Sequence, residues 1–215
     1  MDTGTVHGTA IQSPGYHRSE TKPGAHAGGV FQAIMGPDHL RQRVAYALSE
    51  IWLVSAVKLT PAAVPPYLNL LRKDAFGNYL TLMKDVTLSP AMGHYLDMVN
   101  NDKPNPKAGK GANENYAREV MQLFSIGTDE LNIDGTLQLK SGQPIPTYTQ
   151  DTIEGFANAF TGWTYAPVTG TYSRVHNPAN WLAPMVAFAS NHDETPKLLL
   201  NGKTLPAMQT PEKDL

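Results

Sequence analysis

Short apolar segments with helical spacing, each opened by a proline or capping signal, are the strongest constraint on this chain of 215 residues. Between Asp38 and Trp52, apolar residues recur mostly at steps of three or four and form one helical face. Similar segments follow three further start signals, which are Pro65-Pro66, Ser89-Pro90 and Thr149. No apolar run reaches the about 18 residues that a membrane span requires. The sequence therefore predicts a mainly α fold, an irregular multi-helix domain without a membrane span.

Two parts of the chain depart from helical spacing. Asp134-Gly135 and Ser141-Gly142 are turn signals beside alternating residues, which predicts a small β-hairpin excursion. After Trp163 the chain becomes rich in Pro, Asn and Thr and loses its periodicity. We therefore expect a loop-rich C-terminal third, with one short hairpin around Asn201-Gly202.

Composition also sets the expected boundaries. Residues 1–36 are rich in Gly, His, Thr and Pro and show no sustained periodicity, which predicts an irregular N-terminal arm. Residues 37–215 are expected to form a single helical domain. Because the ending "PEKDL" carries no terminating signal, we expect this domain to be cut off at its C-terminus.

The charge balance and the lack of cysteine exclude several classes of function. Charged residues make up 17% of the chain and the net charge is -2, so the basic surplus typical of a nucleic-acid binder is missing. The absence of cysteine removes disulfides, thiolate catalysis and thiolate zinc ligands. The first residues lack the charged-then-apolar order of a signal peptide. None of these features determines the compartment.

The densest group of charges lies in the segment "GANENYAREVMQLFSIG". Asn113 is the expected N-cap of a helix here, and Gly127 is its expected end. Glu114 and Arg118 are spaced i,i+4 and share one face, whereas Glu119 borders the apolar stripe. The charges therefore lie at the edge of a helix that buries its other side.

Two interpretations of these charges stay open. In the first, they form an ion-pair network that ties the helix to its neighbours, with Arg41 or Arg43 as candidate partners. In the second, Glu114 or Glu119 is the general base of an active site that includes Arg118.

A second candidate is His192-Asp193, the one His-Asp dipeptide of the chain. A histidine beside a carboxylate can serve as a catalytic base or bind a divalent ion such as Ca²⁺, Mg²⁺ or Zn²⁺. A capping or turn role explains the same pair. No His-x-x-x-His or His-Glu-x-x-His spacing exists, and His94 and His176 are isolated in the sequence.

Five ordered blocks carry a resemblance to a known family: "LRQRVAYALSEIWLVS", "AFGNYLTLMKDVTLSPAMGHYLDMVNN", "NENYAREVMQLFSIG", "YTQDTIEGFANAFTGW" and "HDETPKLLL". Between about residue 38 and residue 200 the chain resembles DUF1800, a family of large bacterial proteins that are often exported. The resemblance implies no activity and no catalytic residues, because the family has no settled function.

Two functions from different classes are therefore carried forward. The first is a hydrolase that acts on an ester, lactone or amide bond of a small molecule, with or without a divalent metal ion. Its site would combine Glu114, Arg118, Glu119, His192 and Asp193, the last two being the metal ligands. The alternative is a helical scaffold or binding module in which the "ENYARE" charges are structural. An exposed apolar surface would favour a homo-oligomer.

Overall fold

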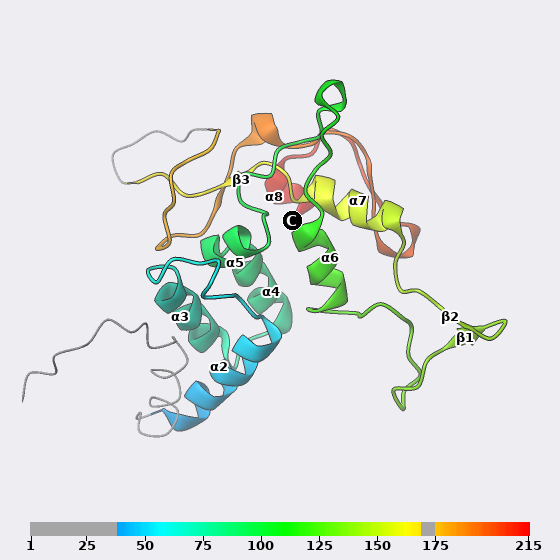
Figure 1. Ribbon diagram of the computed structural model, residues 1–215, viewed down its shortest axis with the longest axis horizontal. Helices are drawn as coiled ribbons and strands as arrows, with labels where there is room; N and C mark the ends of the chain where they lie inside the picture. Colours follow the sequence, from blue (N-terminus) through cyan, green and yellow to red (C-terminus); the bar gives the residue numbers. More distant parts are fainter. Residues whose placement is uncertain (1–37, 169–174) are drawn as a thin grey trace, which may run out of the picture.

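A computed structural model describes residues 38–168 and 175–215 (Figure 1). Helices dominate these residues, which confirms the mainly α fold. The helices are α2 (His39–Ile51), α3 (Val64–Asp74), α4 (Tyr79–Thr87), α5 (Pro90–Tyr95), α6 (Asn115–Gln122), α7 (Gln150–Ala159) and α8 (Pro211–Asp214). Three antiparallel pairs accompany them: β1 (Leu139–Lys140) with β2 (Gln143–Pro144), β3 (Trp163–Thr164) with β4 (Val186–Ala187), and β5 (Lys197–Leu198) with β6 (Thr204–Leu205). The expected arm over residues 1–36 lies outside the described residues.

The helices α3, α5 and α7 begin where local signals in the sequence place them. Prolines occupy the first turns of α3 and α5, where the N–H that proline lacks has no helical partner. The hydroxyl of Thr149 caps α7 by accepting a hydrogen bond from the backbone N–H of Thr152. The Asn113 side chain accepts from the N–H of Asn115 at 2.9 Å, just before α6. The cap position itself is Glu114, one residue after the expected Asn113, and α6 ends at Gln122, before the expected end at Gly127; Gly127 has a φ of 75° and follows the turns after the helix.

A buried tryptophan joins the first helices to α6. Trp52 follows α2 and is fully buried, with its ring centroid 4.4 Å from that of Phe124. Its carbonyl oxygen accepts a hydrogen bond of 2.6 Å from the hydroxyl of Tyr67 on α3. Leu40 and Ile51 belong to the expected apolar face of α2, yet both are exposed. Part of that face is therefore left uncovered by the described residues.

The C-terminal hairpin is fixed by close packing on α7, which contacts α6 on one side and β5 on the other. On the α6 side, the rings of Tyr116 and Phe160 meet edge to face at 5.1 Å. On the β5 side, a Cβ at Gly155 would lie 1.8 Å from the carbonyl oxygen of Leu198. Glycine is therefore required at this position for the strand to lie so close to the helix.

The predicted hairpin excursion is present as a projecting segment, here called the β-arm (residues 128–147). It contains β1 and β2, and Figure 1 shows it extending away from the body beyond α6 and α7. Two isolated bridges continue this pairing. One joins Asp129 to Pro146 at the base of the arm, and the other joins Leu131 to Leu137 near its other turn. The turns fall at the two predicted dipeptides, where Gly135 and Gly142 have positive φ angles.

Candidate functional site

The charges of α6 form a partly exposed pair that links two helices. Arg118 donates a hydrogen bond of 2.9 Å from Nη2 to Oε2 of Glu114. The other oxygen of Glu114 accepts from Nε2 of Gln150 on α7 at 2.9 Å. Arg41, expected as a partner of this group, instead binds Asp38 at 2.8 Å. The tie therefore runs from α6 to α7. Neither of the two candidate partners supplies it, since Arg41 binds Asp38 and the exposed Arg43 forms no ion pair among the described residues.

Glu119 has a different environment from Glu114. Its Oε2 atom is buried and has no hydrogen-bond partner among the described residues. None of the hydrogen bonds or ion pairs of the described residues links Glu119 to Glu114 or to His192. Arg118 therefore meets Glu114, whereas Glu119 stands apart from this pair.

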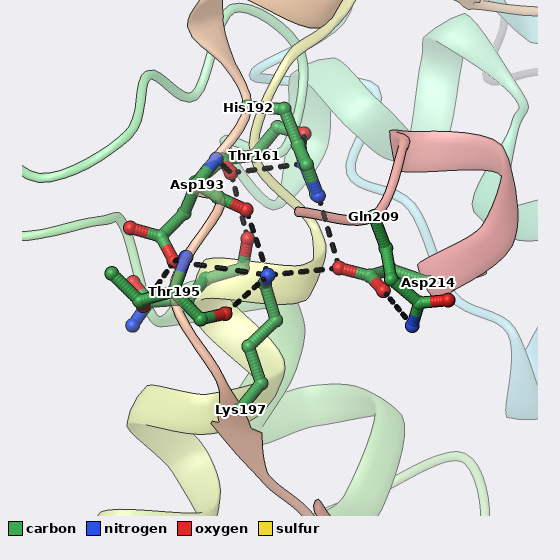
Figure 2. Close-up of polar contacts among 8 residues, drawn as sticks. Thr161, His192, Asp193, Thr195, Lys197, Gln209 and Asp214 are labelled. Atoms are coloured by element: carbon green, nitrogen blue, oxygen red, sulfur yellow. Dashed lines mark hydrogen bonds and ion pairs between the residues drawn. The ribbon is translucent and has the colours of Figure 1, made fainter. Parts of the chain in front are cut away.

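His192 and Asp193 belong to a buried network around Lys197 (Figure 2). The Nζ atom of Lys197 donates to the carbonyl oxygens of Asp193 at 2.7 Å and Thr195 at 2.9 Å. It also lies 2.9 Å from Oδ2 of Asp214 on α8. The side chains of Lys197 and Asp214 are both 0% exposed. The network therefore fixes α8 against the loop that precedes β5.

The hydrogen bonds of His192 occupy both ring nitrogens. Nδ1 lies 2.8 Å from the carbonyl oxygen of Thr161, which can only accept, so Nδ1 carries a proton. Nε2 lies 2.9 Å from Oδ2 of Asp214. The carboxylate of Asp193 accepts from both the N–H and the hydroxyl of Thr195. Both ring nitrogens are thus directed at oxygen atoms of the protein, which supports a structural role for the His-Asp pair.

The predicted residues therefore form two separate groups. The Glu114–Arg118 pair contacts α7 from the α6 side, whereas the His192 network lies on the loop and strand that pack on the other side of α7. Within residues 38–168 and 175–215, no group of three or more His, Cys, Asp or Glu side chains is arranged to hold a metal ion. A metal site at His192 and Asp193 stays a prediction without structural support.

A polar cleft of about 700 Å³ lies elsewhere, against the loop between α5 and α6. Its polar lining residues are His94, Asp97, Asn100, Asn101, Asp102, Lys110, Asn113 and Tyr165. Two of them, Asp97 and Asn100, adopt left-handed backbone conformations with φ angles of 58° and 59°. Such conformations are costly for residues other than glycine and cluster at functional sites. The cleft is therefore the leading candidate for a functional site in the described residues.

Long-range hydrogen bonds hold the loop of the cleft in place. The carboxylate of Asp97 accepts from Lys58 at 2.8 Å and from Asn115 at 3.1 Å. The side chain of Asn101 accepts from the backbone N–H of Asn113 and donates to its carbonyl oxygen. The two edges of the loop are thereby fixed to each other and to the start of α6.

One lining residue, Asp102, meets a histidine from a distant part of the chain that is not itself part of the cleft lining. Nε2 of His176 lies 2.9 Å from Oδ1 of Asp102. The same oxygen accepts a hydrogen bond of 2.6 Å from Nδ2 of Asn191, and Nζ of Lys110 lies 3.9 Å from Oδ2. His176 is exposed, whereas Asp102 is partly buried. A carboxylate that is fixed by an amide can orient an accessible imidazole, as the aspartate of a His-Asp dyad does, although here the contact is made through Nε2.

A second histidine stands on the cleft wall. Nδ1 of His94 lies 2.9 Å from the hydroxyl of Tyr165, and both rings meet Trp181 edge to face. Burial raises the pKa of Tyr165 to about 12, so its phenol keeps its proton at neutral pH. This proton can be donated to Nδ1 of His94, which would place the ring proton on Nε2.

Sequence patterns could not reveal this site. His94 and His176 have no chemical partner near them in the sequence, and the segment that carries Asp102 is typical of a solvated loop. The sequence does carry one indication, the segment "LDMVNNDKPN", because Asp and Asn are, after glycine, the residues that most readily adopt left-handed backbone conformations. Two of the predicted features, Asn113 and the start of α6, do border the cleft.

The fold and the cleft define a mainly α-helical protein whose polar site is built by the loop between α5 and α6. The chain belongs to the DUF1800 family, since the model of that family, described as a protein of unknown function, matches residues 12–214. No curated protein and no solved structure matches this chain. Among the described residues, every helix is too short or too polar to cross a membrane.

Proposed function

We propose that this protein is a hydrolase that cleaves an ester, lactone or amide bond of a small molecule bound in the polar cleft. The observation that supports this proposal is the 2.9 Å contact between His176 and Asp102 beside a cleft of about 700 Å³. A cleft of this volume lies within the range that binds small organic ligands. The proposal keeps the predicted class of reaction but moves its site away from His192 and Asp193.

The role of the dyad follows from its geometry. When Nε2 of His176 donates its hydrogen to Asp102, the lone pair of Nδ1 is left to act as a general base. Nδ1 takes a proton from water while the water oxygen bonds to the substrate carbonyl carbon and the carbonyl electron pair moves to its oxygen. When this oxyanion collapses, the leaving alcohol or amine takes the proton back from His176. Asp102 stabilises the imidazolium in the interval.

Other cleft residues can stabilise the charge that forms on the carbonyl oxygen. Lys110 supplies a cation on the lining, and Nε2 of His94 can supply an N–H when Tyr165 donates to Nδ1. The chemistry needs no metal ion, so activity should persist in the presence of a chelator. Loss of activity on chelation would instead support the metal-assisted form of the hydrolase.

A panel of carboxylic esters, lactones and amides tests the proposal on the full chain. Asp102→Asn and His176→Gln should each lower kcat by about 10²–10⁴, the usual contribution of general base catalysis. His39→Gln is the matched control, because His39 is an exposed histidine on α2, outside the cleft lining. Retained circular dichroism of each variant would separate lost catalysis from lost folding. No hydrolysis by the wild type on any substrate, or unchanged kcat in both dyad variants, would refute the proposal.

The scaffold alternative has one observation in its favour. Glu114, Arg118 and Gln150 connect α6 to α7, which is the structural role that this alternative gives to the "ENYARE" charges. If the wild type hydrolyses nothing and Arg118→Met changes only stability, the scaffold becomes the better description.

A further inference from the structure

Most side-chain oxygen atoms on the lining of the polar cleft are already used within the protein. Both carboxylate oxygens of Asp97 accept hydrogen bonds from side chains outside the lining. Oδ1 of Asp102 accepts from an amide outside the lining, whereas its Oδ2 atom faces Lys110 at 3.9 Å. Oδ1 of Asn101 accepts from the backbone N–H of Asn113. A ligand in the cleft therefore meets few side-chain acceptors that lack a partner.

Two asparagine amides on the lining are held by their oxygen atoms. Oδ1 of Asn113 accepts a hydrogen bond of 2.9 Å from the backbone N–H of Asn115, so this atom is the amide oxygen. Oδ1 of Asn100 accepts one of 2.7 Å from the hydroxyl of Thr164, whose own oxygen accepts from the N–H of Asn177. Among the described residues, neither Nδ2 atom of these two lining amides has a partner. Both NH₂ groups are thus left to donate to a ligand.

A histidine and a lysine complete this set of donors. Nε2 of His94 has no hydrogen-bond partner among the described residues and carries the ring proton when Tyr165 donates to Nδ1. Lys110 supplies the cation of the lining, and its Nζ atom lies too far from Asp102 for a hydrogen bond. The Lys110 side chain is 64% exposed, and such exposed pairs hold their partners weakly. The lining therefore offers four donor groups to a ligand.

The charge around the cleft is positive after its ion pairs are counted. The loop of residues 96–114 and the two residues that pair with it carry five basic and three acidic side chains: Lys58, Lys103, Lys107, Lys110 and Arg118 against Asp97, Asp102 and Glu114. Lys103 and Lys107 form no ion pair among the described residues, so a net charge of +2 remains even when Lys110 is assigned to Asp102. A positive surplus of this kind attracts anions to the cleft.

We propose that the cleft binds a carboxylate group, and that the substrate of the proposed hydrolase therefore carries a carboxylate in addition to the bond that is cleaved. A carboxylate has two acceptor oxygens and no donor, which complements the amides of Asn100 and Asn113 and the ammonium of Lys110. Its single negative charge matches the single cation of the lining. Binding of the carboxylate does not depend on hydrolysis, whereas its assignment to a substrate rests on the proposed function. With Lys110 engaged in this way, His94 is left to stabilise the carbonyl oxygen.

NMR titration of the full chain with butyrate and with its neutral counterpart butyramide tests the site apart from catalysis. Butyrate should bind at least about tenfold more tightly than butyramide, as expected for hydrogen bonds to a charged group. Lys110→Met should lower the affinity for butyrate by about tenfold or more for the same reason. Lys107→Met is the matched control and should leave this affinity nearly unchanged, because Lys107 is exposed on the same loop but outside the lining.

Substitution of the lining asparagines by aspartate removes a single donor. Asn113→Asp keeps the oxygen that accepts from Asn115 but replaces the NH₂ group by a negatively charged oxygen, so butyrate binding should be lost while circular dichroism is retained. Asn105→Asp adds the same charge to the same loop outside the lining, and the oxygen that accepts from the N–H of Ala108 is likewise kept. Equal loss of binding in the two variants would show a general effect of charge and would overturn the proposal.

Hydrolysis of monomethyl succinate and dimethyl succinate then tests the assignment to a substrate, because only the first ester carries a carboxylate. The wild type should prefer monomethyl succinate by at least about tenfold in kcat/KM, and Asn113→Asp should abolish this preference. Butyrate binding without hydrolysis of either ester would uphold the site and refute the proposed function.

The opposite results would overturn the carboxylate site. Equal kcat/KM for the two esters, with butyrate bound no more tightly than butyramide, would leave the proposed hydrolase standing without this site. Inorganic phosphate that binds more tightly than butyrate would show that the donors are arranged for a different anion and would overturn the assignment to a carboxylate.

Discussion

Replacing Lys197 with methionine should destabilise the protein strongly, because it removes the cation at the centre of the buried network. Nζ of Lys197 contacts the carbonyl oxygens of Asp193 and Thr195 and the carboxylate of Asp214 within 2.9 Å. Methionine has nearly the same length and fills the same space, so the change isolates the charge and its hydrogen bonds. The carboxylate of Asp214 would keep His192 and Gln209 as partners but would lose its closest full charge.

The magnitude follows from the burial of both partners. Lys197 and Asp214 are each 0% exposed, and breaking such a pair by removing one member costs about 3–5 kcal/mol. The two carbonyl oxygens that lose their donor are part of this cost, since an unsatisfied buried acceptor costs about 1–3 kcal/mol. A shift in Tm of about 2–4 °C for each kcal/mol is typical of a chain of this size. Lys197→Met should therefore lower Tm by about 6–20 °C.

Urea and thermal unfolding, followed by circular dichroism, measure this effect. Lys73→Met is the matched control: Lys73 lies 2.5 Å from Asp85 but is 68% exposed, and exposed pairs contribute about 0–1 kcal/mol. If Lys197→Met lowers Tm no more than Lys73→Met does, the reasoning that the buried network fixes α8 is refuted.

Two further substitutions test the packing and the electrostatics of the body. Gly155→Ala should destabilise by about 2 kcal/mol or more in urea unfolding, because its Cβ meets the backbone of Leu198; the gain in helix propensity of about 1 kcal/mol does not offset this clash. Gly111→Ala, with nothing within 4 Å of the new Cβ, should leave stability nearly unchanged, and equal effects at the two sites would contradict the packing argument. Burial raises the pKa of the Asp74 carboxyl, so the folded state binds this proton more tightly than the unfolded state does. The protonated carboxyl therefore contributes to the free energy of unfolding at low pH, and this contribution falls as the pH rises from about 4 through the raised pKa. Asp74→Asn should therefore be more stable than the wild type at pH 7, and its free energy of unfolding should lack this part of the pH dependence. If urea unfolding gives both proteins the same change in the free energy of unfolding between pH 4 and pH 7, the assignment is refuted.

Most of the helical architecture could be predicted because its signals are local. A start signal such as Pro90 or Thr149 acts on the first turn that follows it, and apolar spacing over three turns is contained within one segment. The turn at Ser141-Gly142 likewise depends on backbone conformations of two adjacent residues. These interactions span no more than a few residues, so a single sequence carries enough information to place them.

The sequence by itself determined the mainly α class, the starts of α3, α5 and α7, the hairpin turns and the pair Glu114–Arg118, which is spaced i,i+4. Only the tertiary structure decided which side chains from distant parts of the chain meet. His176 meets Asp102 across 74 residues. His192 belongs to a polar segment of the sequence, yet it is buried and contacts Asp214, which lies 22 residues further along the chain. No periodicity or capping rule encodes such pairs, because they form only when separate segments pack around a common core and the burial of each side chain is fixed by its neighbours in space.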